Sequence, residues 1–285
     1  MKYKEYILTL SCTDKIGIVS AVTTMLAENG LFILELSQFS DPSTGQFFMR
    51  IDFQVQKEGL EEKTISSTFE EIAEKFQMSF QLHDKCYRPK VLLMVSKQSH
   101  CLNDLLHRHA SGTLPIDIPA VVSNHKDLEE MVSWYKIPFH HLPITKENKG
   151  VQEDKLLSMV TELDIDLIVL ARYMQIVSPK ICDKLHGKII NIHHSFLPSF
   201  KGAKPYHQAY ERGVKVIGAT AHYVTSDLDE GPIIAQETTH VRHDHTPKQL
   251  VQLGCDVECL VLMRAIKYQI EQRVLLNNHK TVVFN

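Results

Sequence analysis

The sequence predicts an α/β protein with two domains, and two patterns along the chain carry that prediction. Up to about residue 83, apolar and polar residues alternate in short runs, which is typical of an antiparallel sheet with one solvated face. From residue 90, nearly continuous apolar runs alternate with helical segments, which is typical of a doubly wound, mostly parallel sheet. A chain of 285 residues also favours about two domains. We expect domains over 1–84 and 90–285, joined by a linker over 85–89.

The elements of the first domain follow from local spacing. Residues 5–12 alternate like a strand, and apolar residues then recur at helical spacing until Asn29-Gly30 stop the helix. Two more strands are expected over 31–40 and 46–55, joined by the turn-forming stretch DPSTG. A polar helix over about 60–76 and a strand near 78–83 complete the domain. The order βαββαβ predicts a small ferredoxin-like fold with an antiparallel sheet.

The second domain begins after the stretch DKCYRPK, where Pro89 breaks the pattern. Strands are expected over 90–96, 118–124, 165–173 and 188–194, and helices over 101–110, 126–136, 153–164 and 178–187. A strand pair over 214–224 and 232–241 precedes a long helix over about 247–269, and the tail TVVF could add an edge strand. In such sheets ligands bind beyond the carboxyl ends of the strands, so we look for function there.

Composition narrows the class of protein. The net charge of −3 gives no electrostatic case for nucleic acid, whose binding proteins normally show a basic surplus. We find no run of 18 apolar residues and no basic-then-apolar leader, so neither membrane insertion nor secretion is expected. The six cysteines form no CxxC pair, which suits free thiols in a cytoplasmic protein. Cys255 and Cys259 share one helix face, where two small core residues are favoured over a metal or redox pair.

A polar cluster stands at the end of the strand that contains KIIN. Asn191 and His193 alternate there, so their side chains point to the same face. Pro198, Gly202 and Pro205 are expected to hold the following loop in irregular geometry. The next strand pair brings His222 and an acidic loop that ends in Asp229-Glu230-Gly231. An amide and an imidazole can stabilise an oxyanion, while a carboxylate orders water or moves protons.

Each of these residues also has a plain structural interpretation. A strand-end Asn often only satisfies backbone groups, and Asp227, Asp229 and Glu230 could form a solvated turn. His194 is expected to face the opposite side from His193 and to act as a structural hydrogen-bonding partner. His240, His243 and His245 lack the spacing of a zinc site such as HExxH, and a surface loop is favoured there.

Two linked motifs, NIHHSFLPSFKGAKPYHQA and GATAHYVTSDLDEGPIIAQ, resemble the formyltetrahydrofolate-dependent formyltransferase family, and within it the formyltetrahydrofolate deformylase group. The resemblance covers residues 89 to 285. It implies catalytic roles for Asn191, His193 and Asp229, with His222 and His194 in support and no metal or further cofactor. It also implies that folate, the substrate, contacts two segments, whose residues are Met174, Gln175, Ile176, Val177, Ser226, Asp227 and Leu228.

One departure from the family bears on the reaction. Ribonucleotide transferases of this family end their first strand in a glycine-rich turn that holds substrate phosphate through backbone N–H groups. Here that place reads SKQSHC, without a glycine that lets the backbone approach an anion closely, although Lys97 could still attract one. The resemblance therefore implies hydrolysis of 10-formyltetrahydrofolate to formate and tetrahydrofolate, which balances one-carbon pools for purine synthesis. A formyltransferase with an amine acceptor and a catalytically silent folate sensor stay open as alternatives, as does a metal-dependent hydrolase built on residues 240–245.

The first domain resembles an ACT domain in its βαββαβ order and in the stretch TDKIGIVSAVTTMLAENG. Such domains bind small effectors, often amino acids, near the first strand-to-helix turn, which makes candidates of Asp14, Lys15, Ile16, Gly17 and Ile18. The structural alternative is that Asp14 caps the helix and Gly17 permits close packing. Exposed sheet edges of ACT domains usually pair with another chain, so a homo-oligomer is expected.

Overall fold

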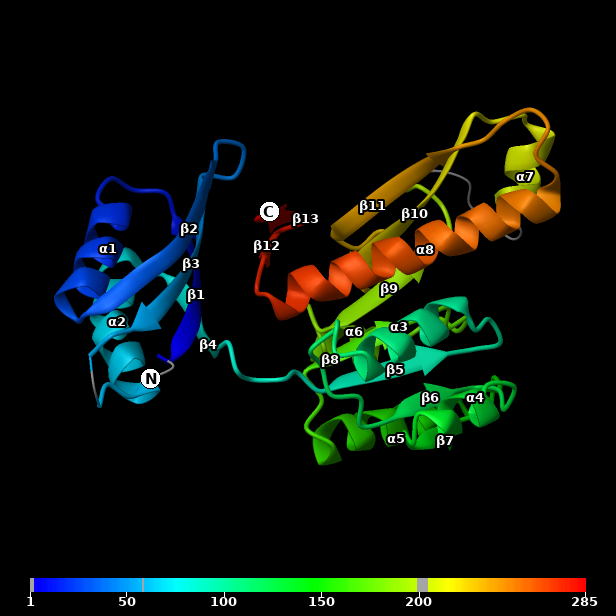
Figure 1. Ribbon diagram of the computed structural model, residues 1–285, viewed down its shortest axis with the longest axis horizontal. Coiled ribbons are helices and arrows are strands. Elements are labelled where there is room, and N and C mark those ends of the chain that lie inside the picture. The colour runs from blue at the N-terminus through cyan, green and yellow to red at the C-terminus, as the bar shows by residue number, and fades with distance from the viewer. Residues whose placement is uncertain (1–2, 58, 199–204) are drawn as a thin grey trace. The chain divides into compact units, whose positions relative to one another are not determined.

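A computed structural model describes residues 3–57, 59–198 and 205–285, and the chain divides into two compact units (Figure 1). The first unit holds the residues up to Tyr87 together with Glu271–Asn277 and Val282–Asn285. The second holds Arg88–Ile270 and Asn278–Thr281. The chain passes from one unit to the other between Tyr87 and Arg88, within the predicted linker. Each unit has its own sheet and its own core.

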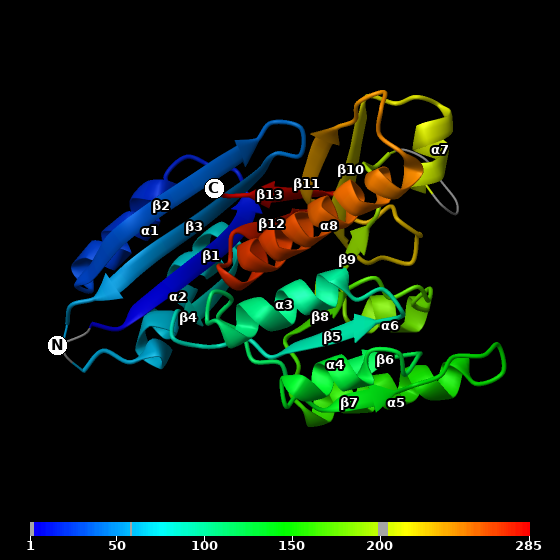
Figure 2. The same ribbon diagram turned by 45° about the vertical axis from the view of Figure 1, so that its right-hand side comes forward.

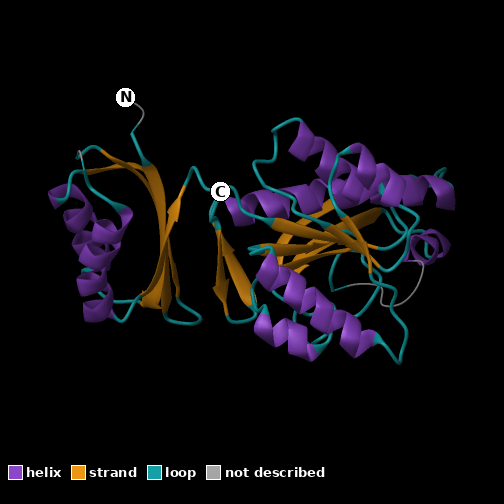
Figure 3. Ribbon diagram, turned by 90° about the horizontal axis from the view of Figure 1, so that it is seen from below, coloured by secondary structure: helices purple, strands orange, loops and turns teal. Residues whose placement is uncertain are grey.

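The first unit has the predicted βαββαβ order. Its elements are β1 (Glu5–Thr13), α1 (Ile18–Glu28), β2 (Leu31–Asp41), β3 (Gln46–Val55), α2 (Glu62–Phe76) and β4 (Ser79–Asp84). The sheet order is β2-β3-β1-β4, with antiparallel neighbours, and both helices cover one face of it (Figure 3). Leu8, Met49 and Phe53 on that face are buried against Leu26 and Phe69 of the helices. The predicted fold of this unit is confirmed.

The C-terminal segment differs from its prediction, which assigned it to the second domain. It forms a hairpin of β12 (Val274–Asn277) and β13 (Lys280–Val283), a separate two-stranded sheet. Val282 and Phe284 form an apolar cluster with Phe48 of β3, and the Arg50 guanidinium donates to the carbonyl of Glu271 at 3.1 Å. Most of the tail belongs to the first unit because these contacts bury it there.

The second unit is a doubly wound sheet with helices on both faces (Figure 3). Its elements are β5 (Val91–Val95), α3 (His100–Ala110), β6 (Val121–Ser123), α4 (Glu129–Trp134), β7 (Phe139–His141), α5 (Lys149–Glu162), β8 (Leu167–Leu170), α6 (Pro179–Lys184), β9 (Ile189–His193), α7 (Pro205–Glu211), β10 (Val216–Tyr223), β11 (Ile233–His240) and α8 (Pro247–Ile270). The strand order is β11-β10-β9-β8-β5-β6-β7. Strands β5 to β9 run parallel to one another, and β10 pairs antiparallel with both β9 and β11. The long helix α8 runs beside β9, β10 and β11 (Figure 2).

Strand order reverses between β5 and β8, which are neighbours in the sheet although β6 and β7 lie between them in the chain. Such a switch point leaves a crevice beyond the carboxyl ends of the two strands. Here those ends continue into Ser96 and Arg172. The interior of the sheet is almost wholly aliphatic, with Leu92, Val122 and Ile168 fully buried, so the strand ends are held on a rigid support.

Two short elements of the second unit's described residues escaped the sequence analysis. Strand β7 has only three residues, too few to show a period. Helix α7 begins at Pro205, where an irregular loop was predicted, because the fixed φ of proline suits the first turn of a helix. Gly202 of the same prediction lies outside the described residues. Within the described part of the chain, every helix is too short or too polar to cross a bilayer.

Candidate active site

Strand pairing places Asn191 beside His222. In the antiparallel register of β9 and β10, Asn191 lies opposite His222, and the Nδ2 atom of Asn191 is 3.2 Å from Nε2 of His222. The other ring nitrogen of His222, Nδ1, lies 2.9 Å from the carbonyl oxygen of Tyr223, which can only accept a hydrogen bond. The proton of a neutral His222 ring is therefore on Nδ1, and Nε2 accepts a hydrogen bond from the Asn191 amide. This fixes which way the Asn191 amide points.

The acidic loop between β10 and β11 brings Asp229 to the same place. Its Oδ1 atom lies 3.2 Å from Nδ1 of His193 and 3.8 Å from Nε2 of His222. Asp229 has a left-handed backbone (φ 59°), which is uncommon for a residue other than glycine. A Cβ atom at Gly231 would lie 1.8 Å from the carbonyl oxygen of Tyr223, so this position admits only glycine. The structure thus brings together Asn191, His193, Asp229 and His222.

Charge in the site is set by these contacts. A hydrogen bond from His193 lowers the pKa of Asp229, although partial burial acts against it. Burial lowers the pKa of His222, against a smaller raising effect of its bond to the Tyr223 carbonyl. Asp229 is therefore ionised and His222 neutral at pH 7. The Asp229 carboxylate and the Asn191 amide both approach Nε2 of His222, and Asp229 also contacts His193.

The backbone after His193 is tied to the strands next to it. Thr220, fully buried in β10, donates its hydroxyl to the Ser195 carbonyl at 3.0 Å and accepts from the Leu197 N–H at 3.0 Å. Gln236 of β11 donates to the Leu197 carbonyl and to the Thr220 hydroxyl. Residues 195–197 are therefore held by side chains of two strands, and this keeps the end of β9 in place.

His194 lies elsewhere than the sequence analysis predicted. Its ring stacks on that of His193, with ring centroids 5.1 Å apart, instead of facing the opposite side. Side-chain alternation ends with β9 at His193, and residue 194 already lies in a bend. Burial, assisted by the charge of Arg172, lowers the pKa of His194 to about 4, so its ring is uncharged at neutral pH.

Beyond His194 lies a polar network with a buried centre that the sequence analysis missed. It joins Gln98, His100, Arg172, Tyr206 and Glu258, and Glu258 is only 1% exposed. Two signals could have found it: an arginine directly after the buried strand LIVLA, and a lone acid in the apolar run VECLVL of α8. Charged residues are seldom buried unless paired, so each of these positions calls for a partner.

Two segments predicted to contact folate present apolar side chains to solvent. Met174 and Ile176 are 57% and 61% exposed, and Leu228 of the loop after β10 is 61% exposed. Ser96 holds the first of these segments, because its hydroxyl accepts from the Met174 N–H at 2.9 Å. Gln175 and Val177 are half-buried, and Ser226 and Asp227 are exposed. Large exposed apolar side chains near a polar cluster are typical of a ligand site.

Two groups of possible metal ligands among the described residues make poor metal sites. The ligand atoms of His100, Cys101 and Glu258 lie within 4.8 Å of one another. Both carboxylate oxygens of Glu258 are already taken, however, and the Arg172 guanidinium beside them repels a cation. His240 ends strand β11, whereas His243 and His245 lie in the predicted loop, where His243 is exposed and His245 half-buried. Cys255 and Cys259, expected in the core, are half-buried free thiols.

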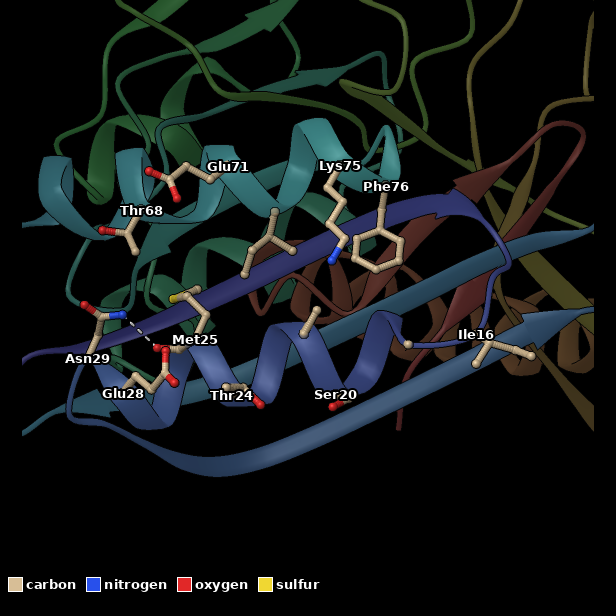
Figure 4. Close-up of a pocket in the computed structure, with 13 residues that line it drawn as sticks. Ile16, Ser20, Thr24, Met25, Glu28, Asn29, Thr68, Glu71, Lys75 and Phe76 are labelled. Carbon is tan, nitrogen blue, oxygen red and sulfur yellow. Dashed lines mark hydrogen bonds between the residues drawn. The ribbon is translucent and has the colours of Figure 1, made fainter.

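The first unit has a pocket of its own, of about 640 Å³, between α1 and α2 (Figure 4). Of the predicted effector residues, Ile16 and Gly17 line it, beside the charged side chains of Glu28, Glu71 and Lys75. The remaining residues of that prediction are Asp14, Lys15 and Ile18; the first two are exposed and Ile18 is buried in the core.

The alternative structural roles for the turn before α1 were wrong. The residue that precedes the helix is Gly17, with φ 96°, and no side chain caps the helix. Asp14 instead donates its backbone N–H to the Gly45 carbonyl. The nearest atom to a Cβ at Gly17 would be 4.0 Å away, so the glycine serves the backbone conformation and not close packing.

Fold and site together define a protein of the formyltransferase class, and the formyl transferase family matches residues 89–266. The formyltetrahydrofolate deformylase of Corynebacterium sp. (strain P-1) is 51% identical over 279 residues, 98% of each chain. That of Bacillus subtilis (strain 168) is 46% identical over 281 residues, 98% of this chain and 93% of the other. The crystal structure of the Burkholderia mallei ATCC 23344 formyltetrahydrofolate deformylase has a TM-score of 0.95 at 48% identity, covering 99% of this chain and 100% of the other. The chain belongs to the formyltetrahydrofolate deformylase family.

Proposed function

We propose that the chain is a hydrolase that converts 10-formyltetrahydrofolate and water to tetrahydrofolate and formate. The observation that carries the proposal is the approach of Asp229 to His193, 3.2 Å between carboxylate and ring, next to the oriented amide of Asn191. An ionised carboxylate, an imidazole and an amide donor suffice for attack of water on a formyl carbon. The family to which the chain belongs supports the same reaction.

Each residue of the trio has one role in the proposed reaction. Asp229 orients the attacking water and accepts its proton. Asn191 and His193, the latter with a proton on each ring nitrogen, donate to the formyl oxygen as it becomes an oxyanion. His193 then passes its Nε2 proton to the leaving nitrogen of the folate as the carbon–nitrogen bond breaks, and the proton that Asp229 took from water restores the ring. His222 holds the Asn191 amide in its donating orientation, and His194 supports the ring of His193.

Folate is proposed to bind along the exposed apolar side chains beside this trio. Backbone groups of residues 174–177 would read the pteridine ring, and Ser226, Asp227 and Leu228 would form the other wall. The anchoring of Met174 by Ser96 supports this assignment, because a fixed backbone can present its N–H and C=O groups to a flat heterocycle.

Release of formate from 10-formyltetrahydrofolate in buffer without any amine tests the proposal. Stoichiometric formate and tetrahydrofolate are expected, and addition of a primary amine should change neither the rate nor the product. Formylated amine as the main product would instead establish a transferase. Saturable folate binding without any product would establish the silent sensor, and loss of activity on exhaustive chelation would point to a metal-dependent hydrolase.

We further propose that the first unit binds a small amino-acid effector and assembles the chain into a homo-oligomer. Support for the effector comes from the pocket at Gly17, where Lys75 can meet a carboxylate and Glu28 or Glu71 an ammonium group (Figure 4). Support for assembly comes from the edge strand β2, on which Phe32, Leu34 and Phe39 are exposed. A cytoplasmic location remains a prediction from the free cysteines.

A further inference from the structure

Glu258 is the centre of the buried network beyond His194. The Oε1 atom of its carboxylate accepts from the Tyr206 hydroxyl at 2.7 Å, and Oε2 lies 2.7 Å from Nε2 of His100 and 3.4 Å from Nε of Arg172. Arg172 also donates to the side-chain oxygen of Gln98 at 2.6 Å. These partners come from α3, α7 and the segments that follow β5 and β8, so a carboxylate on α8 joins the elements around the switch point of the sheet.

Helix α8 is shaped to receive the Tyr206 ring. Gly254 lies one turn before Glu258, and a Cβ atom there would be 2.1 Å from the Tyr206 ring. Glycine is unfavourable inside a helix, so its presence indicates that the space is needed. The ring therefore lies along α8, and its hydroxyl reaches Glu258 one turn later.

Arg172 shows a second sign of constraint. It is 7% exposed and has a left-handed backbone, with φ 65°. Non-glycine residues hold such a conformation where their surroundings impose it, and these positions concentrate at functional sites. Here the Ser96 N–H donates to the Arg172 carbonyl at 3.3 Å, and the side chain is fixed by Gln98 and Glu258.

A series of ring contacts connects the network to the reacting groups. The Tyr206 ring lies 6.3 Å from that of His194, and the His194 ring lies 5.1 Å from that of His193, whose Nδ1 atom is 3.2 Å from Asp229. The charged and titratable groups around His194 come from five parts of the second unit, and they are His193, Arg172, Asp229, Tyr206 and Glu258. Behind Glu258 stands His100, in contact with Cys255.

We propose that Glu258 and Arg172 are positioning residues that hold the His194 ring against His193, so that His193 alone exchanges a proton at the reacting carbon. The proposal rests on the proposed function, in which His193 and Asp229 act on the formyl group. Arg172 disfavours a positive charge on His194, and Glu258 keeps Arg172 in place and compensates its charge. A charged His194 would weaken the attraction between the Asp229 carboxylate and His193, because it would pair with the same carboxylate.

Arg172→Gln and Glu258→Gln remove opposite charges from the same network, which makes them matched variants. In Arg172→Gln, His194 gains a proton more readily although its burial remains, so we expect kcat at pH 6 to fall up to about twofold further than kcat at pH 8. In Glu258→Gln, we expect a fall of about tenfold at pH 8 from lost positioning, without that extra loss at pH 6. KM for 10-formyltetrahydrofolate should stay within about twofold in both, because the hydrogen bonds and ion pair of these two side chains are made within the network.

The double variant Arg172→Gln/His194→Asn tests whether the effect passes through His194. The extra loss at pH 6 should disappear relative to His194→Asn alone, because the group that gains the proton is gone. An identical pH profile in both charge variants, or an extra loss that persists without His194, would overturn the proposal. General damage to the fold would lower both variants alike at every pH.

If the thermal transition shows that a charge variant does not fold, Tyr206→Phe provides a second test of the proposal. This change retains the ring against His194 and removes one hydroxyl, so kcat should fall by about three- to tenfold at constant KM. Wild-type kcat in Tyr206→Phe would overturn the positioning role. Failure of wild-type enzyme to release formate without an amine would instead overturn the proposed function, so the two failures are distinct.

Discussion

His193 and Asp229 lie 3.2 Å apart, from ring Nδ1 to carboxylate Oδ1, although one ends a strand and the other belongs to a loop between the next two strands. The contact makes Nδ1 of His193 a donor, so the opposite nitrogen, Nε2, is the one left for the substrate. It also keeps the Asp229 carboxyl ionised, because the same hydrogen bond lowers its pKa. One contact thus sets the donor role of Nδ1 in His193 and the charge of Asp229.

Replacement of Asp229 by asparagine should abolish most turnover without loss of the fold. Asp229→Asn removes the base that accepts the proton of water, while its size and one acceptor oxygen are retained. We expect kcat to fall by at least about 10² to 10³, with folate affinity largely intact. Formate release gives kcat and fluorescence titration with a non-hydrolysed folate gives affinity. Near-normal turnover of the purified variant would defeat the assignment of Asp229.

Removal of the Asn191 amide should have an effect of the same size. One lost oxyanion donor typically costs roughly 3 to 4 kcal/mol of transition-state stabilisation, so Asn191→Ala should lower kcat about 10²- to 10³-fold. The change should spare KM, because the amide acts on charge that develops during reaction. Steady-state kinetics at saturating and low folate separate the two constants. A rise in KM at constant kcat would mean that Asn191 only binds substrate.

His222 should matter through Asn191 alone. In His222→Phe the Asn191 amide loses the acceptor 3.2 Å away that fixes its orientation, and one neutral hydrogen bond corresponds to a factor of about ten in kcat. In the double variant with Asn191→Ala, the His222 change should add little. Independent, multiplying losses would show that His222 acts directly on the substrate.

Gly254 and Gly150 offer a matched pair for the packing of α8. A Cβ at Gly254 would overlap the Tyr206 ring at 2.1 Å, whereas a Cβ at Gly150 of α5 meets nothing within 4 Å. Gly254→Ala should therefore destabilise the protein by about 1–3 kcal/mol, and Gly150→Ala should be neutral or stabilise it by up to about 1 kcal/mol. Thermal transitions of the two variants beside wild type give the comparison. Equal stability of both variants would mean that Tyr206 can leave its place freely.

A feature of the fold or the site could be predicted from the sequence where it depends on residues close together in the chain, and not where it depends on distant ones. The strands and most helices follow from local periodicity, and Asn191 with His193 stand out because polar residues end an apolar strand. Their alignment with His222 depends on the register of β9 and β10, which no local pattern fixes. Periodicity also fails at the ends of strands. It placed His194 on the wrong side, because the strand ends one residue earlier.

The missed residues are those whose meaning depends on distant partners. In the sequence, Glu258 is an unexplained acid in an apolar helix; in the structure, Tyr206 and His100 from other elements are its hydrogen-bonding partners. The tail was misassigned for a similar reason, since Val282 and Phe284 find their apolar partner at Phe48, on a strand near the other end of the sequence. Sequence reasoning can flag such residues as unpaired, but it cannot supply the partner.

Stability should depend on His194 in a defined pH window. Burial lowers its pKa in the folded protein from 6.5 to about 4, so between those values the unfolded chain binds a proton that the folded one does not. The free energy of unfolding therefore rises with pH across this window, and the contribution is lost as pH falls from 6.5 toward 4. Between pH 7.5 and pH 5 we expect wild type to lose about 1–2 kcal/mol more than His194→Gln, which cannot titrate there. Thermal transitions at the two pH values measure the difference, and His243→Gln, a change at an exposed loop position, controls for the loss of one histidine. Equal losses in wild type and His194→Gln would show that the His194 ring is not held uncharged in the folded protein.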